Sequence, residues 1–208
     1  ASYLITYGVE PHQPARVEVL ERLGLEARKY FLYVSRFEPE NNPHRVIQAY
    51  SQVGGEMPLV MVGHAPYAGR FISDLRQRAD SRVIFPGSIY GDGYRELQAG
   101  ALAYIHATEV GGTHPALVEA MGYGNCLLVN DAPENREVVG DCGLYFRASE
   151  PVTLTRLFDQ VLAEPRTAAD LGVAAANRAT QLYSWDTVTR QYAELFGRLA
   201  DNSAKRPR

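Results

Sequence analysis

Five short apolar runs, each separated by a stretch able to form a helix, restrict the folds open to this chain. The runs are YFLYVS (30–35), PLVMVG (58–63), RVIFPG (82–87), ALAYIHA (101–107) and NCLLVN (125–130). Near-continuous apolar runs of this length are typical of strands that are buried on both faces, as in a parallel sheet. The helix-forming stretches lie at about 43–54, 67–79, 92–100 and 115–124. Strand alternating with helix predicts an α/β fold built on a doubly wound parallel sheet.

Helical patterns alone follow the last of these runs. Two helices are predicted at 151–164 and 166–182, and Ser184-Trp185-Asp186 opens a third. That last helix carries one apolar stripe, made by Val188, Tyr192, Leu195 and Leu199. No linker to a second domain is apparent, so we expect one domain over residues 1–199 and a polar, disordered tail over 200–208.

Composition excludes several classes of protein. The chain has 208 residues, with 24 acidic and 21 basic side chains interspersed, so a protein that coats nucleic acid is disfavoured. No apolar run reaches the length needed to span a bilayer. Cys126 and Cys142 lack CxxC spacing and are expected to be reduced thiols rather than a disulfide or a metal pair, and the histidines show no metal-ligand spacing. Because the chain begins at Ala1 without Met, we expect a piece of a longer protein.

The loops that follow the strands are the places to look for a ligand site, because open α/β sheets bind ligands at the carboxyl ends of their strands. Arg36 follows the first strand, where its guanidinium could grip phosphate oxygens, or could pair with a neighbouring glutamate such as Glu38. Gly63 and Gly87 end the next two strands, and a glycine there admits a ligand close to the backbone or forms an ordinary turn. Ile89 could pack on a nucleobase.

The segment EVGGTHPALVEAM (109–121) predicts a glycine loop that turns into a helix. Gly111 and Gly112 permit unusual backbone angles, Thr113 or His114 can cap the helix, and Pro115 suits its first turn. His114 could contact a ligand instead of capping, and the whole loop from Gly111 to His114 is a candidate donor-binding segment. The free N–H groups and the positive end of the helix dipole favour an anion at such a start.

Two glutamates flank that anion site. Glu119 lies on the same helical face as Pro115, about 6 Å further along the axis, and its side chain leans back toward the helix start. A carboxylate repels phosphate but accepts two hydrogen bonds from a vicinal diol, such as a ribose beside that phosphate. Glu109 would face the other side of the anion. The alternative is a plain capped helix with two solvated glutamates.

The ordered set SRFEPENN, VMVGHAP, VIFPGSI, YIHATEVGGTHPALVEAMGYGNCLLVND and PENREVVGDCGLYF resembles the C-terminal, donor-binding domain of GT-B glycosyltransferases of family 4. That domain is Rossmann-like and forms one half of the enzyme. The EPENN and EVGGTHP patterns resemble a bacterial, rhamnosyltransferase-like branch most. The chain has no GxGxxG after its first strand and no GxxxxGK[ST], which disfavours a dinucleotide site and a P-loop.

The resemblance assigns roles to individual residues. It places Glu109 beside the donor sugar, Glu119 on the nucleotide ribose and Arg36 on the donor diphosphate. Nine residues separate the two glutamates here, where the family usually has seven. Asn41 stands where the family usually has a lysine that binds the donor, which removes one cation from the expected diphosphate site. Gly63, Gly87 and Ile89 would border the nucleotide.

The resemblance also implies an activity, namely transfer of a hexose or deoxyhexose from a nucleotide-diphosphate sugar to a glycan or lipid-linked acceptor, with retention. Neither a cofactor nor an obligatory metal is implied. The acceptor would bind an N-terminal domain that this chain lacks, so the chain should be inactive alone, and its last helix would brace that domain with a partly exposed apolar stripe. The expected location is cytoplasmic, compatible with peripheral association of the full enzyme at the inner membrane surface.

Two other functions stay open. One is a GT-B nucleotide-sugar epimerase; a phosphorylase would need a pyridoxal-phosphate lysine, and Lys29 and Lys205 are unsuitably placed. The other is a non-catalytic α/β nucleotide-binding or regulatory module. A receiver-like module is disfavoured because the first strand ends in Ser35-Arg36 rather than in an acidic cluster.

Overall fold

The computed structural model describes residues 3–10, 18–110 and 112–204, and its centre is a six-stranded parallel sheet. The strand order is β3-β2-β1-β4-β5-β6. Their bounds are β1 Phe31–Val34, β2 Leu59–Val62, β3 Val83–Gly87, β4 Ala103–His106, β5 Cys126–Asn130 and β6 Gly143–Phe146. The chain builds outward from β1 to β3, then returns to the other side of β1, so β1 and β4 are neighbours at the switch point where such sheets bind ligands.

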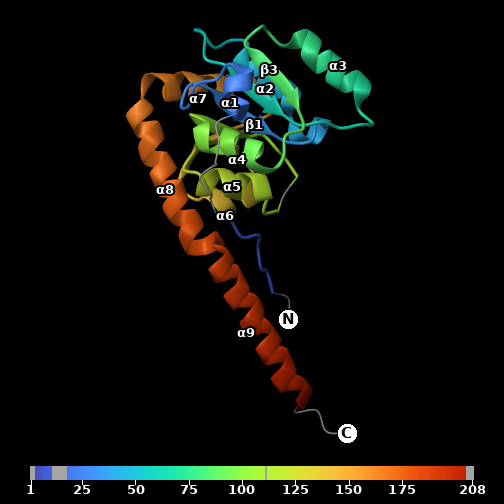
Figure 1. The fold of residues 1–208 in the computed structure, drawn as a ribbon, viewed down its shortest axis with the longest axis vertical. Coiled ribbons are helices and arrows are strands. Elements are labelled where there is room, and N and C mark those ends of the chain that lie inside the picture. The colour runs from blue at the N-terminus through green and yellow to red at the C-terminus, as the bar shows by residue number, and fades with distance from the viewer. Residues whose placement is uncertain (1–2, 11–17, 111, 205–208) are drawn as a thin grey trace.

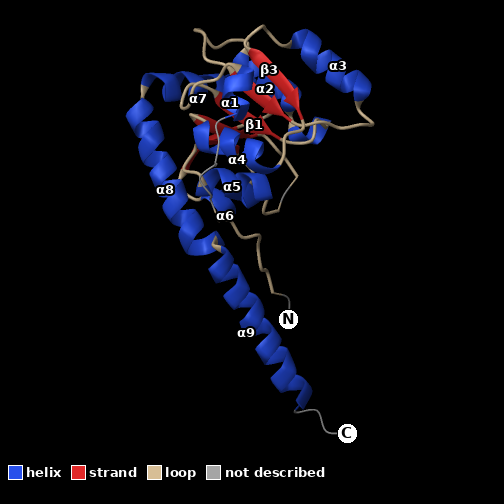
Figure 2. Cartoon of the chain, in the orientation of Figure 1, coloured by secondary structure: helices blue, strands red, loops and turns tan. Residues whose placement is uncertain are grey.

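Helices cover both faces of this sheet (Figure 1, Figure 2). Their bounds are α1 Glu18–Leu23, α2 Pro43–Tyr50, α3 Gly69–Arg78, α4 Gly91–Gly100, α5 Pro115–Gly122, α6 Pro133–Val139, α7 Pro151–Ala163, α8 Pro165–Tyr183 and α9 Trp185–Ala204, with a 3₁₀ turn, η1, at Pro39–Asn41. The predicted strands and longer helices are confirmed to within a few residues. β6, α1 and α6 were not predicted.

Alternate residues of each strand enter opposite cores, which explains the apolar runs. Phe31 and Tyr33 of β1 pack with α2, α3 and α7, and the Phe31 ring lies 4.7 Å from that of Phe158. Leu32 of β1 and Tyr104 of β4 face α1, α4, α5 and α8. Each fully buried aliphatic or aromatic side chain stabilises the fold by roughly 1.5–3 kcal/mol relative to exposure. The doubly wound arrangement is therefore confirmed.

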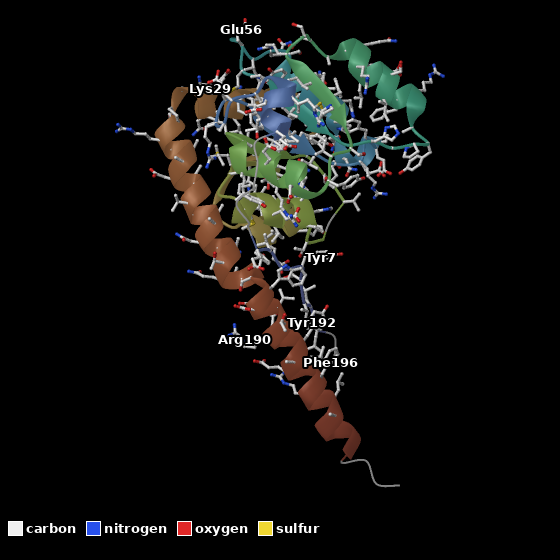
Figure 3. The ribbon with its side chains drawn as sticks, viewed as in Figure 1. Tyr7, Lys29, Glu56, Arg190, Tyr192 and Phe196 are labelled. Atoms are coloured by element: carbon white, nitrogen blue, oxygen red, sulfur yellow. The ribbon has the colours of Figure 1, made fainter. Side chains whose placement is uncertain are left out.

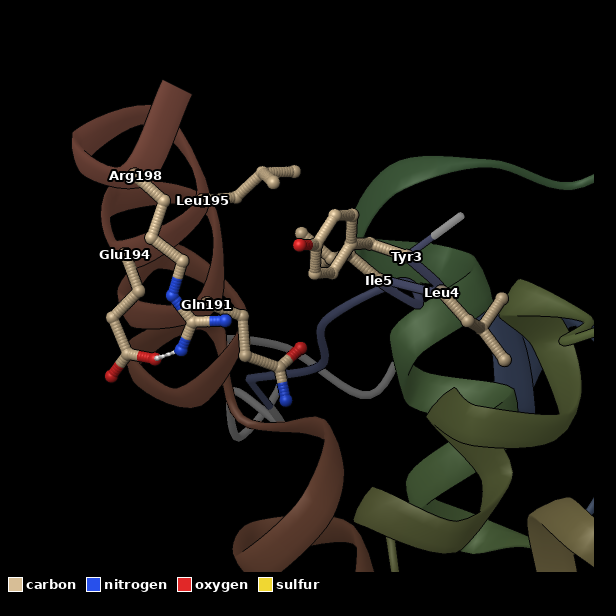
Figure 4. A pocket seen from close by; sticks show the side chains of 7 residues that line it. All are labelled: Tyr3, Leu4, Ile5, Gln191, Glu194, Leu195 and Arg198. Atoms are coloured by element: carbon tan, nitrogen blue, oxygen red, sulfur yellow. Dashed lines mark ion pairs between the residues drawn. The ribbon is translucent and has the colours of Figure 1, made fainter. Parts of the chain in front are cut away.

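The last helix, α9, projects away from the sheet beside the N-terminal segment 3–10 (Figure 1). The Val9 amide donates to the Tyr183 carbonyl at 2.6 Å, and a Cβ on Gly8 would lie 2.5 Å from the Trp185 ring. A shallow cavity of about 150 Å³ separates the segment from α9 further on, between Tyr3 and Leu195 (Figure 4). The Val9–Tyr183 bond and the packing of Gly8 on Trp185 hold the N-terminal segment against the junction of α8 and α9.

An apolar stripe runs along α9, as the sequence predicts. Val188 is buried, whereas Tyr192 and Leu199 are 44% and 52% exposed. Tyr192 and the nearby Phe196, 61% exposed, lie on the side of α9 toward the N-terminal segment that carries Tyr7 (Figure 3). The helix continues to Ala204, into the segment predicted to be a disordered tail, and residues 205–208 lie outside the described part. Across the described residues no helix combines the length and the apolar character that a membrane crossing requires.

Both cysteines are free thiols. Cys126 is buried at the start of β5, and burial raises its pKa to about 12, so it stays protonated. The sequence-based interpretation of two reduced thiols agrees with this geometry.

Candidate functional site

A crevice of about 240 Å³ lies at the carboxyl edge of the sheet and is built from four loops or helix starts. Its lining residues are Val34, Ser35 and Arg36 after β1, Val62, Gly63 and His64 after β2, Ser88, Ile89 and Tyr90 after β3, and Ala116 in the first turn of α5. Three residues selected from sequence, Arg36, Gly63 and Ile89, thus share one crevice. Tyr90 is 83% exposed at its rim.

Gly63 is required by a contact within the protein. Its φ is 151°, and a Cβ built there would lie 1.8 Å from the carbonyl oxygen of Ser35. The absence of a side chain lets the loops after β1 and β2 close against each other. Gly87 differs, because its φ of 83° favours glycine while the space around it is open. Its carbonyl accepts from the Gly63 amide at 3.0 Å, which joins the third loop to the second.

Arg36 presents an exposed guanidinium to the crevice. Its Nη1 lies 3.5 Å from Oε1 of Glu38, a mostly buried carboxylate that also accepts from the Tyr67 hydroxyl. The guanidinium side chain is 73% exposed. Solvent screens the guanidinium end of this pair, and a pair screened in this way is worth about 1 kcal/mol, so an incoming phosphate can take the guanidinium from Glu38. The Arg36–Glu38 pair, which the sequence left open as an alternative, is thus present, and it is weak enough for Arg36 to bind a ligand as well.

Asn41 does not project into the crevice. It is buried at the end of η1, where its Nδ2 donates to the Arg36 carbonyl at 2.9 Å and its Oδ1 accepts from Thr108 Oγ1 at 3.2 Å. The Tyr33 hydroxyl donates to the Asn41 carbonyl at 2.7 Å. Both ends of the amide are therefore used to fasten the loop after β1, including the backbone of Arg36.

Glu109 is exposed after β4 but is tied to the same loop. Asn42 takes a left-handed backbone with φ of 57°, and its Nδ2 donates to Glu109 Oε1 at 3.0 Å and to the Ala107 carbonyl at 2.9 Å. The Glu109 amide donates to the Glu40 carbonyl at 3.2 Å. These bonds hold Glu109 on the side of the loop that carries Arg36.

The start of α5 differs from the predicted cap. His114 is the N-cap residue by position, yet neither its ring nor the Thr113 hydroxyl makes a capping hydrogen bond to the helix. The ring instead lies 3.0 Å from the Val110 carbonyl through Nε2 and packs 4.8 Å from the buried ring of His106. In the described part of the chain no side chain caps α5. The amides of Leu117 and Val118 both donate to the His114 carbonyl at 3.1 Å, so the first turn offers an anion the Ala116 amide and the helix dipole. Gly112 is exposed with φ of 125°, and Gly111 lies outside the described residues.

Glu119 lies one turn further along α5 and is half-buried. Oε2 accepts from the Tyr94 hydroxyl of α4 at 2.6 Å. The carboxylate lines a second cavity of about 320 Å³, together with Tyr94, Gly91, Arg95 and Trp185 among others. Consecutive residues line the two hollows, Tyr90 the crevice and Gly91 this cavity. Of the two predicted glutamates, Glu119 therefore lines this second cavity, whereas Glu109 lines neither it nor the crevice.

Three residues near the site were missed from sequence: Asn42, Tyr94 and His106. Asn42 and Tyr94 act through partners far along the chain, 67 positions away at Glu109 and 25 positions away at Glu119. His106 packs on the ring of His114, which is close in sequence. The EPENN segment indicated a role for Asn41 and none for its neighbour Asn42. Tyr94 and Gln98 are spaced four apart on α4, a helical spacing that could have marked a shared face.

The chemistry of these groups suits an anion joined to a polyol. Arg36 and the α5 amides attract negative charge, whereas Glu109 and Glu119 are acceptors for hydroxyl groups. Among the described residues, no group of three or more His, Cys, Asp or Glu side chains is arranged to hold a metal ion. Ile89 and the exposed Tyr90 give the crevice an apolar wall for a planar group.

Similarity to known proteins identifies the family of the chain. The family model for the Glycosyl transferases group 1 matches residues 18–178. A GDP-mannose-dependent alpha-(1-6)-phosphatidylinositol monomannoside mannosyltransferase of Mycolicibacterium smegmatis is 28% identical over 203 residues, which cover 89% of this chain and 52% of that protein.

Solved structures show the same fold. The HepE protein of Anabaena in complex with UDP and glucose matches with a TM-score of 0.80 at 21% identity, over 89% of this chain and 53% of that one. Sucrose-phosphate synthase of Thermosynechococcus elongatus matches with a TM-score of 0.84 at 21% identity, over 96% and 53%. The chain therefore spans about half the length of the relatives it matches.

Proposed function

The chain belongs to the group 1 glycosyl transferases, and on that premise we propose that it binds the nucleotide-sugar donor of a retaining glycosyltransferase of family 4. The observation that carries the proposal is the crevice itself. Arg36, Gly63, Ile89 and the first turn of α5 meet there, at the carboxyl ends of β1 to β3. That edge of a doubly wound sheet is where such folds bind nucleotides.

Each part of the donor has a matching group. The diphosphate lies between Arg36 and the uncapped start of α5, where charge on the departing nucleoside diphosphate is stabilised. The base packs against Ile89. The ribose hydroxyls reach Glu119 in the second cavity, and Glu109, held by Asn42, faces the sugar. Asn41 replaces the family's lysine with an amide that holds the Arg36 backbone, so the diphosphate depends on one guanidinium and a helix dipole.

The donor sugar is a hexose or deoxyhexose in this proposal. The mannosyltransferase of M. smegmatis uses GDP-mannose by its name, and HepE was solved with UDP, so guanine and uracil nucleotides are the first to test. We propose a glycan or lipid-linked acceptor, bound by a second domain. The half-length match to relatives supports such a domain, and the exposed face of α9 offers it an apolar surface.

Titration calorimetry of the 208-residue chain tests the proposal. UDP or GDP should bind, and Arg36→Ala should weaken that binding about thirtyfold, because a charge-assisted hydrogen bond contributes roughly 1.5–3 kcal/mol. Arg36→Lys should restore part of the affinity. The matched control is Arg70→Ala on α3, an exposed arginine outside the crevice, which should bind as the wild type does. Failure of UDP, GDP, dTDP and ADP alike to bind at millimolar concentration would remove the donor site and favour a module that binds no nucleotide.

A further inference from the structure

A series of buried hydrogen bonds runs from the start of β5 to Glu119. Asn125 Nδ2 donates to Gln98 Oε1 at 3.1 Å, Gln98 Nε2 donates to the Tyr94 hydroxyl at 2.9 Å, and Tyr94 donates to Glu119 Oε2 at 2.6 Å. Gln98 and Asn125 are fully buried. A second bond, from Asn125 Nδ2 to the Gln98 backbone carbonyl at 2.9 Å, fixes the series to α4.

The direction in which each hydrogen bond is donated is set along the whole series. The Asn125 amide nitrogen can only donate, so it takes the oxygen of Gln98 and turns the Gln98 nitrogen toward Tyr94. The phenol oxygen then accepts, and its single proton is directed at Glu119. Burial, followed by Tyr104 and Glu119, raises the pKa of Tyr94, which keeps the phenol protonated.

This arrangement restrains a side chain that would otherwise be mobile. A glutamate on a helix surface has three rotatable bonds, and fixing them on ligand binding costs conformational entropy. Tyr94 fixes Oε2 before any ligand arrives. In the described part of the chain, Oε2 is the Glu119 oxygen with a recorded hydrogen bond, so Oε1 and one lone pair of Oε2 are left for a ligand in the cavity that Glu119 lines.

We infer that Tyr94 is the positioning residue for Glu119, orienting its carboxylate so that both oxygens meet the two hydroxyls of a ribonucleotide. This inference rests on the proposed donor site and goes beyond it. It names a residue that touches the carboxylate rather than the nucleotide. It also makes the site selective for ribose over 2′-deoxyribose, since a carboxylate held in one orientation binds two correctly spaced hydroxyls more tightly than one, and a mobile carboxylate does not.

The experiment measures the affinities of UDP, GDP and their 2′-deoxy counterparts for the 208-residue chain by calorimetry. Tyr94→Phe keeps the ring and removes the hydroxyl. It should lower ribonucleotide affinity about tenfold and deoxyribonucleotide affinity much less. In a double-mutant cycle, Tyr94→Phe should add almost nothing once Glu119→Gln is present, because the effect passes through that carboxylate.

Two further variants separate positioning from general packing. Tyr30→Phe removes another buried hydroxyl bonded to α4, through the Leu97 carbonyl at 2.6 Å, and should bind as the wild type does. Should Tyr94→Phe fail to fold, Gln98→Met removes the donor behind Tyr94 and leaves the Tyr94–Glu119 pair, so a smaller loss with the same ribose dependence is expected.

The outcomes are distinct. If the wild type binds a ribonucleotide but Tyr94→Phe binds it equally well, the inference is overturned and the donor site stands. Equal losses for ribose and deoxyribose, or additive losses in the cycle, overturn it too. If the wild type binds none of the four nucleotides, the donor site fails and the inference falls with it. A ribose-specific, non-additive loss in Tyr94→Phe establishes the positioning role.

Discussion

Replacing Gly63 with alanine should destabilise the protein strongly, because the added Cβ would strike the neighbouring loop. The new atom would lie 1.8 Å from the Ser35 carbonyl oxygen, and real Cβ atoms essentially never come within 3.0 Å of another heavy atom. The loops after β1 and β2 must therefore separate, straining the bonds from Ser35 to the Val62 carbonyl and from Gly63 to the Gly87 carbonyl.

The magnitude follows from two contributions. Overpacking in a closed contact costs about 1–3 kcal/mol, and a non-glycine residue at φ of 151° adds about 1–3 kcal/mol of backbone strain. We expect the free energy of unfolding to fall by about 4 kcal/mol, a large share of the roughly 5–15 kcal/mol typical of a domain.

Urea denaturation followed by circular dichroism measures this loss, with Gly87→Ala as the matched control. Gly87 also has a positive φ, but a Cβ there meets open space, so only the strain of about 1 kcal/mol should appear. The reasoning would be refuted if Gly63→Ala lost less than 1 kcal/mol, or no more than Gly87→Ala does.

Three other predictions concern a loop, a buried histidine and a surface. Asn42→Ala should lower the free energy of unfolding measured in urea by about 1–3 kcal/mol, because the Ala107 carbonyl loses its donor. Asn42→Gly should lose less, because glycine suits the φ of 57°. Equal losses would show that the left-handed backbone contributes nothing to the effect. Burial, and then His114, lowers the pKa of His106 to about 3, so the unfolded chain binds a proton that the folded chain does not between about pH 6.5 and 3. Stability should therefore fall as pH drops through that window, by at most about 3 kcal/mol at pH 4.5, and His106→Phe should flatten this slope; an unchanged slope would contradict it. The exposed apolar face of α9 should make the isolated chain self-associate, and Phe196→Ser should reduce the association seen by light scattering more than Val173→Ser does. Val173 is an equally exposed apolar side chain on α8, so equal effects would argue against a docking face on α9.

The sequence was sufficient for the parallel sheet because its evidence is local. Strands buried on both faces are apolar throughout, and four of the five predicted runs are of this kind, whereas β3 lies at the edge of the sheet and is half-buried. β6 was not predicted because GLYF is short, half-buried and begins with glycine. α6 was not predicted because PENREVV has only seven residues, three of them charged. Neither element carries a periodicity long enough to read.

In the site, too, the features that depend on local sequence could be predicted and those that depend on distant contacts could not. Arg36, Gly63 and Ile89 could be placed at one edge because each follows a strand, and the structure puts them in one crevice. The bonds from Asn42 to Glu109 and from Tyr94 to Glu119 could not be predicted, since they join elements whose distance only the fold fixes. The expected cap at Thr113 or His114 was wrong because the His114 ring turns to the Val110 carbonyl instead.

Chemical-shift mapping of the labelled chain with UDP or GDP tests the central claim most directly. The account predicts amide shifts at Ser35 and Arg36, at Gly63, at Ile89 and through 116–119, because these positions line the crevice and the turn of α5 behind it. A larger hollow of about 500 Å³ lies at the amino ends of β4 and β5, lined by Leu102, Gly124 and Asn177 among others. Shifts confined to that opposite edge would contradict the account.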